Sequence, residues 1–512
     1  MKQADRSLIQ VYRDDPAAIG DRLASVDPPA ANATGPWAFR IQGAAPAAAR
    51  YAPGTPEFLY WELAFALDRG KRMWARLAPR PGTWTPGAVL PAIPVAGEDF
   101  NAFYDRKALN FFRGVDPKTK AAVYSGESPD VSTHEQGHAI LDALRPDLWD
   151  APHFEVAAFH EAFGDLAAIF GALTEPVLDA DVVTATRVDP ARSNLVSRLA
   201  EELGKAVRDA YGADAAPPGA LRDAVNAFRY EDPTTLPDSA PATSLSAEPH
   251  SFCRVMTGAA WDILVALFRS APGRDRAAAL AAAAERTARI CVAAADTAPS
   301  GADFFGRVAR RLVQETAARE GPAAARTVGE LLVKRRLLES PDVPAELSRD
   351  EDRRLSVPPD DATGNAALAR AVAARLPRAE GAVLVRGTRG ALPEPAAGLR
   401  VLRGRRRRDL RLSGREFGPA DGACVEIADG FALGFDGGGF LRASGVHPAE
   451  DRDVEDAKAF VRFLVRRRRI AEVAGFAPDS LALARERKTH AVVRDPDGVR
   501  RLKRIWIARE PS

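Results

Sequence analysis

The chain has 512 residues, of which 46% are hydrophobic and 27% are charged, and its formal net charge is +2. This composition is ordinary for globular proteins, and it excludes a wholly disordered, collagen-like or coiled-coil chain. The near-balance of charge gives no whole-chain field that would attract nucleic acid. Cys253, Cys291 and Cys424 are odd in number and far apart, so we expect neither a disulfide framework nor a cysteine-rich zinc ribbon.

The first residues and the hydropathy of the chain bear on where in the cell the protein is expected to be. No apolar run of signal-peptide length follows the first basic residues, and no stretch approaches the length of a membrane span. We therefore expect a cytoplasmic protein with no membrane partner. Export by a route that cleaves no signal stays open.

Taken in chain order, the pattern predicts a protein that is mainly α with α+β parts. Residues 1–54 are rich in Ala and Pro and predict an irregular segment with a short strand at 37–41. Thr55 followed by Pro56 is typical of a helix start. Helices are then expected at 58–77, 131–144, 154–173, 254–269, 274–296, 301–319 and 322–338, with an extended piece at 101–112.

The character of the sequence changes after residue 340. Prolines and aspartates predict a linker at 341–365, and residues 366–512 predict a smaller, basic α+β domain of unknown role. Within it we expect a helix at 448–473 and a hairpin formed by 490–493 and 504–507. The arginine runs 405–408 and 466–469 have no interleaved aromatic residues, so we expect no nucleic-acid partner, with polyanion binding as the alternative.

A histidine motif carries the first chemical signal. His134, Glu135 and His138 form the pattern H-E-x-x-H. On a helix, positions i and i+4 lie on one face, so both imidazoles can reach one metal ion. The carboxylate of Glu135 would then lie where it can take a proton from metal-bound water. The alternative is an ordinary surface helix that happens to carry two histidines.

A second segment supplies what a catalytic zinc site still needs. Such a site has three protein ligands and one open position. Glu161 and Asp165 share a face of the next predicted helix. Glu161 can therefore bind the metal while Asp165 accepts a hydrogen bond from a ligand histidine. Two unrelated surface carboxylates are the alternative.

Together these residues resemble the thermolysin-like zinc metallopeptidases, the gluzincin group with H-E-x-x-H and a downstream glutamate ligand. The resemblance covers about residues 55–340. It implies a thermolysin-like catalytic domain with a reduced N-terminal β part, a helical C-terminal lobe and an active-site cleft between them. The matching segments are 130–139 (Asp-Val-x-x-His-Glu-x-x-His-Ala), 161–171 (Glu-Ala-x-x-Asp, then Ile-Phe-Gly), 101–104 (Asn-Ala-Phe-Tyr), 227–233, and His250 with Ala259-Ala260-Trp261.

The resemblance implies a role for each matching residue. His134, His138 and Glu161 would bind one zinc ion, with Asp165 orienting a histidine. Glu135 would be the general base for attack by a metal-activated water, and His250 would stabilise the oxyanion. Contacts with the peptide substrate would come from Asn101, Ala102, Arg229, Val131 and Phe228.

Several positions depart from the family pattern. The usual assisting tyrosine has no counterpart, and His153 stands in that neighbourhood. His160 replaces an Asn, and Leu245 stands where a carboxylate would partner His250, with Glu248 close by. Asp130 is kept from the family's calcium cluster but Ala172 replaces another of its carboxylates, so calcium binding stays open.

Two functions are compatible with these residues. The first is a zinc-dependent endopeptidase that hydrolyses peptide bonds in a peptide or protein substrate. The second is a catalytically idle zinc-binding scaffold whose C-terminal domain binds a protein or polyanion partner. An intact Glu135 favours the enzyme, because loss of the base is the simplest route to an idle site. The oligomeric state is left open by the sequence.

Overall fold

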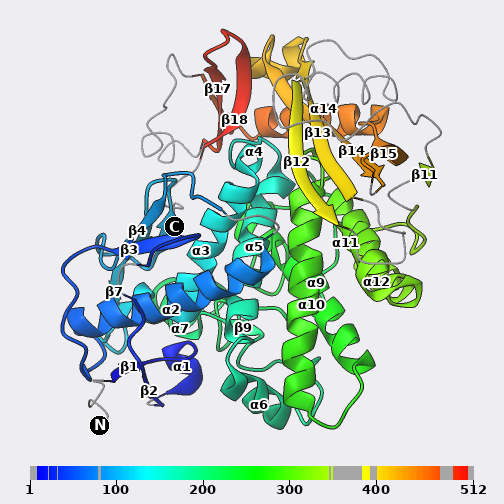
Figure 1. Ribbon diagram of the computed structural model, residues 1–512. Helices are drawn as coiled ribbons and strands as arrows, with labels where there is room; N and C mark the ends of the chain where they lie inside the picture. The colour runs from blue at the N-terminus through cyan, green and yellow to red at the C-terminus, as the bar shows by residue number, and fades with distance from the viewer. Residues whose placement is uncertain are drawn as a thin grey trace. The chain divides into compact units, whose positions relative to one another are not determined.

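The computed structural model describes residues 8–20, 22–30, 33–78, 82–344, 348–349, 383–391, 400–436, 438–472 and 488–505. It has a mixed α and β architecture with several sheets (Figure 1). Its contacts group the chain into two compact units. The first comprises Met1–Pro146 and Ala158–Arg289, and the second comprises Asp147–Ala157 and Ile290–Ser512. Most of the linker expected at 341–365 lies outside the described residues.

The N-terminal segment is more regular than its composition suggests. It forms the strands β1 (Ile9–Val11), β2 (Ala24–Val26) and β3 (Ala38–Ile41) and the short helix α1 (Pro16–Ile19). The expected strand at 37–41 is thus confirmed as β3, and three further short elements interrupt the segment that was expected to be irregular. Ile9 and Val11 are fully buried, so a few apolar side chains between the Ala and Pro residues anchor this segment to the core.

The extended piece expected at 101–112 contributes two strands to a four-stranded sheet in the first unit. Its strand order is β3-β4-β6-β5, with β4 at Val89–Ile93, β5 at Ala102–Tyr104 and β6 at Leu109–Phe111. The pairs β3/β4 and β4/β6 are parallel, and β5/β6 is antiparallel. Strand β5 is therefore the edge strand of this sheet among the described residues. A separate hairpin pairs β7 (Arg113–Val115) with β8 (Ala122–Tyr124).

Three helices of the first unit form around the motifs, as expected. Helix α2 (Pro56–Leu77) begins at Thr55, whose hydroxyl accepts a hydrogen bond from the Phe58 N–H. Helix α3 (Pro129–Leu144) packs against α2 (Figure 1) and is buried along almost its whole length. Helix α5 (Phe154–Ala172) stacks Phe163 on Trp74 of α2, with ring centroids 5.6 Å apart. The other elements that begin in this unit are α4 (Pro146–Trp149), α6 (Pro176–Ala185), β9 (Arg198–Leu199), α7 (Glu201–Tyr211), β10 (Arg222–Asp223), α8 (Pro249–Phe252), α9 (Arg254–Ser270) and α10 (Arg276–Thr297).

The second unit is built on an eight-stranded sheet. Its order is β11-β15-β14-β18-β17-β16, and β13 joins β12 to β14. Helices α11 and α12, expected at 301–319 and 322–338, pack against each other. The bounds are α11 (Phe304–Glu320), α12 (Pro322–Lys334), β11 (Ser348–Arg349), β12 (Val383–Ala391), β13 (Arg400–Arg411), β14 (Cys424–Phe435), β15 (Leu441–His447), α14 (Asp451–Arg466), β16 (Ile470–Glu472), β17 (His490–Arg494) and β18 (Arg500–Arg504).

One helix of this unit ends earlier than its sequence suggests. A helix was expected at 448–473, but α14 ends at Arg466. Arg468 has a φ of 54°, in the left-handed region, and the chain then forms β16, which pairs in parallel with β17. The expected C-terminal hairpin is confirmed, because β17 and β18 pair antiparallel. Residues 506 and 507 lie outside the described residues.

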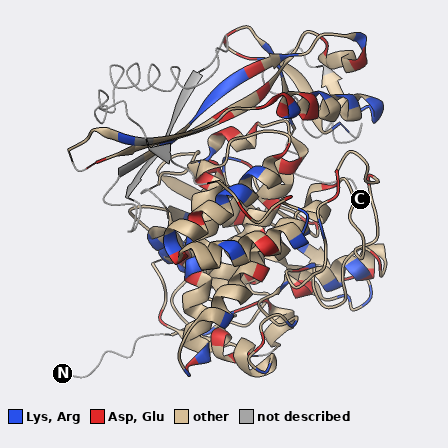
Figure 2. Ribbon diagram, turned by 90° about the vertical axis from the view of Figure 1, so that its right-hand side faces the viewer, with Lys and Arg blue, Asp and Glu red and all other residues tan. Residues whose placement is uncertain are grey.

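Three arginines of the run 405–408 form ion pairs with carboxylates of the second unit. Arg405 pairs with Asp147, Arg406 with Asp429 at 2.9 Å and Arg407 with Glu426 at 2.6 Å. The side chains of Arg405 and Arg406 are each only 9% exposed. Figure 2 shows Lys and Arg interleaved with Asp and Glu along the ribbon. These charges therefore have partners within the fold and do not require a polyanion.

Contrary to the expectation from the sequence, one segment of the described chain has the length and hydropathy of a membrane span. It runs from Pro249 to Ser270, and 83% of its most apolar window is buried. Such burial is what a core helix of a globular domain requires, since its apolar side chains contact protein on all sides.

Four buried carboxyl groups and one partly buried one lie close together in the first unit. Asp130 of α3 accepts a hydrogen bond from the Ala200 backbone N–H at 3.2 Å. Burial, together with the charge of Asp15, raises the pKa of Asp130 to about 7. Burial and neighbouring carboxylates also raise the pKa values of Glu201, to about 10, of Glu202, to about 8, and of Asp14. Burial alone raises the pKa of Asp15. This acidic cluster (Asp14, Asp15, Asp130, Glu201 and Glu202) therefore holds protons that the unfolded chain would release.

Replacing Asp130 by asparagine is expected to stabilise the protein selectively at high pH. In the unfolded chain this carboxyl ionises near pH 4, whereas in the folded protein it ionises near pH 7. Its contribution to stability is thus fully present below pH 4 and is lost as the pH rises to about 7. Relative to wild type, the free energy of unfolding of Asp130→Asn should rise by about 4 kcal/mol between pH 4 and pH 8, as measured by urea unfolding.

A carboxylate with the opposite shift provides the control. Hydrogen bonding to Arg269 lowers the pKa of Asp189, so Asp189→Asn should show no such rise. If the free-energy difference between Asp130→Asn and wild type were independent of pH, the cluster would not hold its protons in the folded state.

Candidate metal centre

Three side chains from two helices converge in the first unit. The Nε2 atoms of His134 and His138, on α3, are 3.1 Å apart. Glu161, on α5, places carboxylate oxygens 3.5 Å from His134 Nε2 and 3.8 Å from His138 Nε2. Among the described residues, these three form the group of His, Cys, Asp or Glu side chains whose ligand atoms all lie within 4.8 Å of one another. Two imidazoles and one carboxylate at this separation fit a tetrahedral zinc ion with one open position.

Two glycines allow the helices to approach closely enough for this convergence. A Cβ atom at Gly164 would lie 2.7 Å from the His134 ring, and one at Gly137 would lie 2.7 Å from the Ala167 Cβ. Real Cβ atoms do not come so near, so larger residues would force α3 and α5 apart. The glycines thus help to set the distance between the histidines and Glu161.

A network on the far side of His134 fixes its ring. Asp165 Oδ1 lies 3.2 Å from His134 Nδ1. Arg222 of β10 donates three hydrogen bonds to Asp165, from Nε at 2.9 and 3.2 Å and from Nη2 at 2.7 Å. The Thr257 hydroxyl donates a further one at 3.1 Å. Because the Asp165 carboxylate holds the N–H at Nδ1, Nε2 is the nitrogen of His134 that would bind a metal once its own proton is displaced.

The pKa values of the two histidines shift in opposite directions. Burial lowers the pKa of His138 to about 3, so its imidazole is neutral, which is the form that binds metal. Burial also opposes the charged form of His134, but hydrogen bonds to Asp165 and Glu161 outweigh it and raise the His134 pKa to about 9. Burial disfavours the charged form of Asp165 as well, yet Arg222 and His134 hold the pKa of Asp165 down at about 2.

Glu135 is buried beside this group. Burial raises its pKa to about 7, an effect that the charge of His134 partly offsets. The backbone N–H of Tyr104, at the end of β5, donates to the Glu135 carboxylate. The Oε2 atom of Glu135 is buried and has no hydrogen-bond partner among the described residues. A buried acceptor without a donor is costly, which fits a site where a bound water completes the arrangement.

His250 lies on the other side of Glu161. Its Nε2 atom is 3.1 Å from Glu161 Oε2, and its Nδ1 atom is 2.7 Å from Glu248 Oε1. Glu248 also caps α8 by accepting hydrogen bonds from the N–H groups of His250 and Ser251. Glu248 therefore occupies the partner position for His250 that Leu245 leaves vacant in the sequence pattern.

The residues expected to contact substrate differ in how close the structure brings them to His134, His138 and Glu161, which we call the histidine-glutamate group. Ala102 lies on the edge strand β5 directly after Asn101, and Val131 is buried in α3. Phe228 packs against the Arg254 guanidinium, 4.1 Å from its ring centroid. Arg229 is exposed, and among the described residues no hydrogen bond or ion pair joins it to the histidine-glutamate group. Arg222 is the arginine that approaches this group, with Nη2 3.5 Å from His134 Nδ1.

The two remaining histidines of the motif region are both fully buried. His153 belongs to the second unit, where its Nε2 atom lies 2.9 Å from the Glu426 carbonyl oxygen. Burial lowers the pKa of His153 to about 4, so it is neutral and held by the C-terminal sheet. The ring of His160 stacks near that of His138, with centroids 5.9 Å apart.

Sequence reasoning missed Arg222, because an arginine in a loop region has no pattern that separates it from Arg229. Only the pairing of β10 with β9 places Arg222 against Asp165. The acidic cluster around Asp130 does not form a further group of three ligand atoms within 4.8 Å of one another in the described part of the chain, so its geometry adds nothing in favour of calcium. Neither a scan against protein-family models nor a search of curated proteins finds a match to this sequence.

Proposed function

We propose that the chain is a zinc-dependent endopeptidase with a thermolysin-like catalytic domain over residues 55–340. The observation that carries the proposal is the convergence of His134, His138 and Glu161 with the buried Glu135 beside them. A catalytic zinc site needs three protein ligands, an open position and a nearby base. The three expected ligands and the expected base all come from α3 and α5.

Zinc, when bound here, would polarise the peptide carbonyl and lower the pKa of a bound water. Glu135 would accept the proton of the attacking water at Oε2, the atom that lacks a protein donor. A base with a pKa near 7 is well matched to proton transfer at neutral pH. The same carboxyl group would then pass the proton to the leaving amine.

His250 and Arg222 would supply positive charge or hydrogen-bond donors around the reacting carbonyl. The Glu248 carboxylate at Nδ1 orients His250 so that Nε2 faces the Glu161 side of the site. A preorganised donor aimed at a developing oxyanion lowers the barrier by a few kcal/mol. Arg222 retains N–H groups beyond those donated to Asp165 and could hold a second substrate carbonyl.

The edge strand β5 suggests how a peptide would be held. An extended peptide can pair with the open side of an edge strand through backbone hydrogen bonds. Strand β5 also donates the Tyr104 N–H to Glu135, so a substrate strand along β5 would lie next to the base. This mode favours cleavage within an extended chain and predicts little dependence on a chain terminus.

The test measures metal and cleavage together. We expect about one zinc ion per chain by elemental analysis, and hydrolysis of a quenched fluorogenic peptide library that a chelator abolishes and added zinc restores. One zinc ion per chain without cleavage would favour the idle scaffold, with the C-terminal domain as the working part. Absence of zinc after reconstitution would contradict both functions.

A comparison of two arginines tests the substrate side of the site. Arg222→Lys removes the hydrogen bonds that the guanidinium Nε and Nη2 atoms donate to Asp165. Because Asp165 orients His134, we expect kcat/KM to fall by about ten- to a hundredfold. Arg229→Lys is the matched control, and it should change kcat/KM less than about twofold because Arg229 is exposed. A larger loss in Arg229→Lys than in Arg222→Lys would reverse this assignment.

A further inference from the structure

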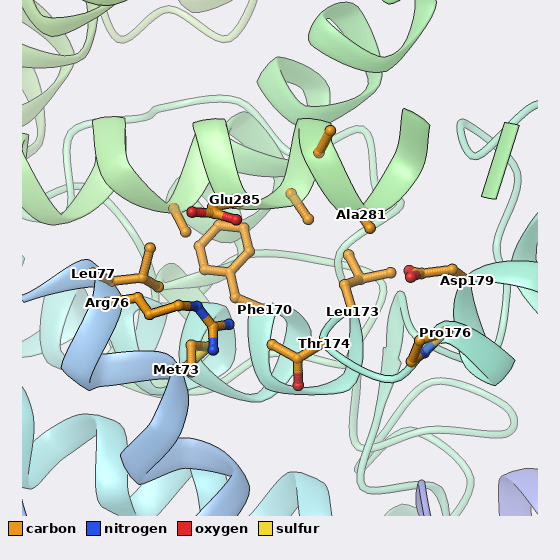
Figure 3. A pocket seen from close by; sticks show the side chains of 13 residues that line it. Met73, Arg76, Leu77, Phe170, Leu173, Thr174, Pro176, Asp179, Ala281 and Glu285 are labelled. Atoms are coloured by element: carbon orange, nitrogen blue, oxygen red, sulfur yellow. The ribbon is translucent and has the colours of Figure 1, made fainter. Parts of the chain in front are cut away.

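A second candidate site lies in the first unit, in a pocket that shares no residue with the histidine-glutamate group. Its volume is about 370 Å³, and its walls come from α2, α5, α6 and α10 (Figure 3). Leu77, Phe170 and Leu173 give it an apolar lining, extended by alanines of α10. Pockets for small molecules span roughly 300 to 1,000 Å³, so this one suits a short ligand.

One charged group inside the pocket is left unsatisfied. The Asp179 carboxylate points into the pocket (Figure 3), yet the residue is only 3% exposed. Its Oδ1 atom has no hydrogen-bond partner among the described residues. Burial, with a contribution from Glu175, raises the pKa of Asp179 to about 7, and no cation of the described chain offsets that shift.

Two of the neighbouring carboxylates are paired with arginines, and the one arginine among the residues lining the pocket lies at the end away from Asp179. Arg13 pairs with Glu175. Arg76, at the other end of the pocket in Figure 3, donates to the Arg72 carbonyl oxygen. Glu285 pairs with Arg289 at 2.6 Å. At the Asp179 end, away from Arg76, an anion would meet Asp179 with Glu175 close by, whereas a cation would meet a carboxylate whose Oδ1 atom lacks a partner among the described residues.

We propose that this pocket binds a small aliphatic amine, with its ammonium group on Asp179 and its alkyl chain against Phe170 and Leu173. The ammonium group would donate a charge-assisted hydrogen bond to the Asp179 carboxylate where it faces the pocket, and it would offset a charge that has no ion-pair partner among the described residues. The alkyl chain would bury apolar surface against the pocket wall. This binding depends on neither zinc nor peptide hydrolysis.

The probe is n-hexylamine, titrated into the full chain at pH 8 by isothermal calorimetry. Neutral n-hexanol and anionic hexanoate have the same alkyl chain and isolate the contribution of charge. Hexylamine should bind at least about tenfold more tightly than hexanol, and hexanoate more weakly than either. Asp179→Asn should weaken hexylamine by about tenfold or more and leave hexanol unchanged. Asp181→Asn, on the same helix but paired with Arg22, should bind hexylamine like wild type.

A second variant tests the location and does not depend on the fold of Asp179→Asn. Ala281→Leu adds volume inside the pocket while the carboxylate stays intact, so it should weaken hexylamine and hexanol alike. The proposal fails if hexylamine shows no binding at about 20 mM or binds no better than hexanol. It fails equally if a folded Asp179→Asn or Ala281→Leu variant binds hexylamine like wild type.

Discussion

Replacing Glu135 by glutamine is expected to reduce peptide hydrolysis by about a thousandfold while zinc stays bound. General-base catalysis contributes about a hundred- to ten-thousandfold to such reactions, and an amide cannot accept the proton that a carboxylate takes. The amide has nearly the same shape, and the side-chain oxygen can still accept the hydrogen bond from the Tyr104 N–H. The expected loss is therefore in kcat, with KM changed little.

The measurements are steady-state kinetics on a quenched peptide and zinc content by elemental analysis of the same samples. Glu330→Gln makes the same chemical change on the exposed face of α12, where the side chain is 58% exposed, and should leave both quantities unchanged. If Glu135→Gln hydrolysed peptide at the wild-type rate, Glu135 would not be the base and the proposed mechanism would be wrong.

Replacing Glu161 by glutamine is expected to lower zinc affinity by about a hundredfold or more. Loss of a group that only orients a ligand costs about ten- to a hundredfold in affinity, and loss of a charged ligand should cost at least as much. The Glu161 carboxylate also lies within 4 Å of His134, His138 and His250. Without its charge, the cation would be bound by two neutral imidazoles alone.

Competition with a chromogenic chelator measures this affinity independently of hydrolysis. The informative comparison is His250→Ala, because His250 lies 3.1 Å from Glu161 but is not a member of the metal-ligand group. That variant should retain zinc while kcat falls by about a hundred- to a thousandfold, as expected when an oxyanion donor is removed. Wild-type zinc affinity in Glu161→Gln would rule out the three-ligand geometry.

Local sequence patterns predicted the helices that carry the site. Thr55 before Pro56 marked the start of α2, and the apolar spacing of 131–144 and 154–173 marked α3 and α5 within about two residues. Such signals are readable because helix starts and helical faces depend on residues only a few positions apart. The same reasoning failed for 448–473, since the end of α14 depends on the pairing of β16 with β17, which joins residues about twenty positions apart.

For the candidate site, the sequence by itself determined which residue types could hold zinc and which could act as base, because His134, Glu135 and His138 lie on one turn of one helix. Only the tertiary structure decided that Glu161 reaches them, that Arg222 rather than Arg229 contacts Asp165, and that Glu248 partners His250. The pocket around Asp179 likewise depends on four helices that are distant in the chain. Contacts within a helical turn follow from backbone geometry, whereas contacts between elements depend on how whole helices pack, as at Gly137 and Gly164.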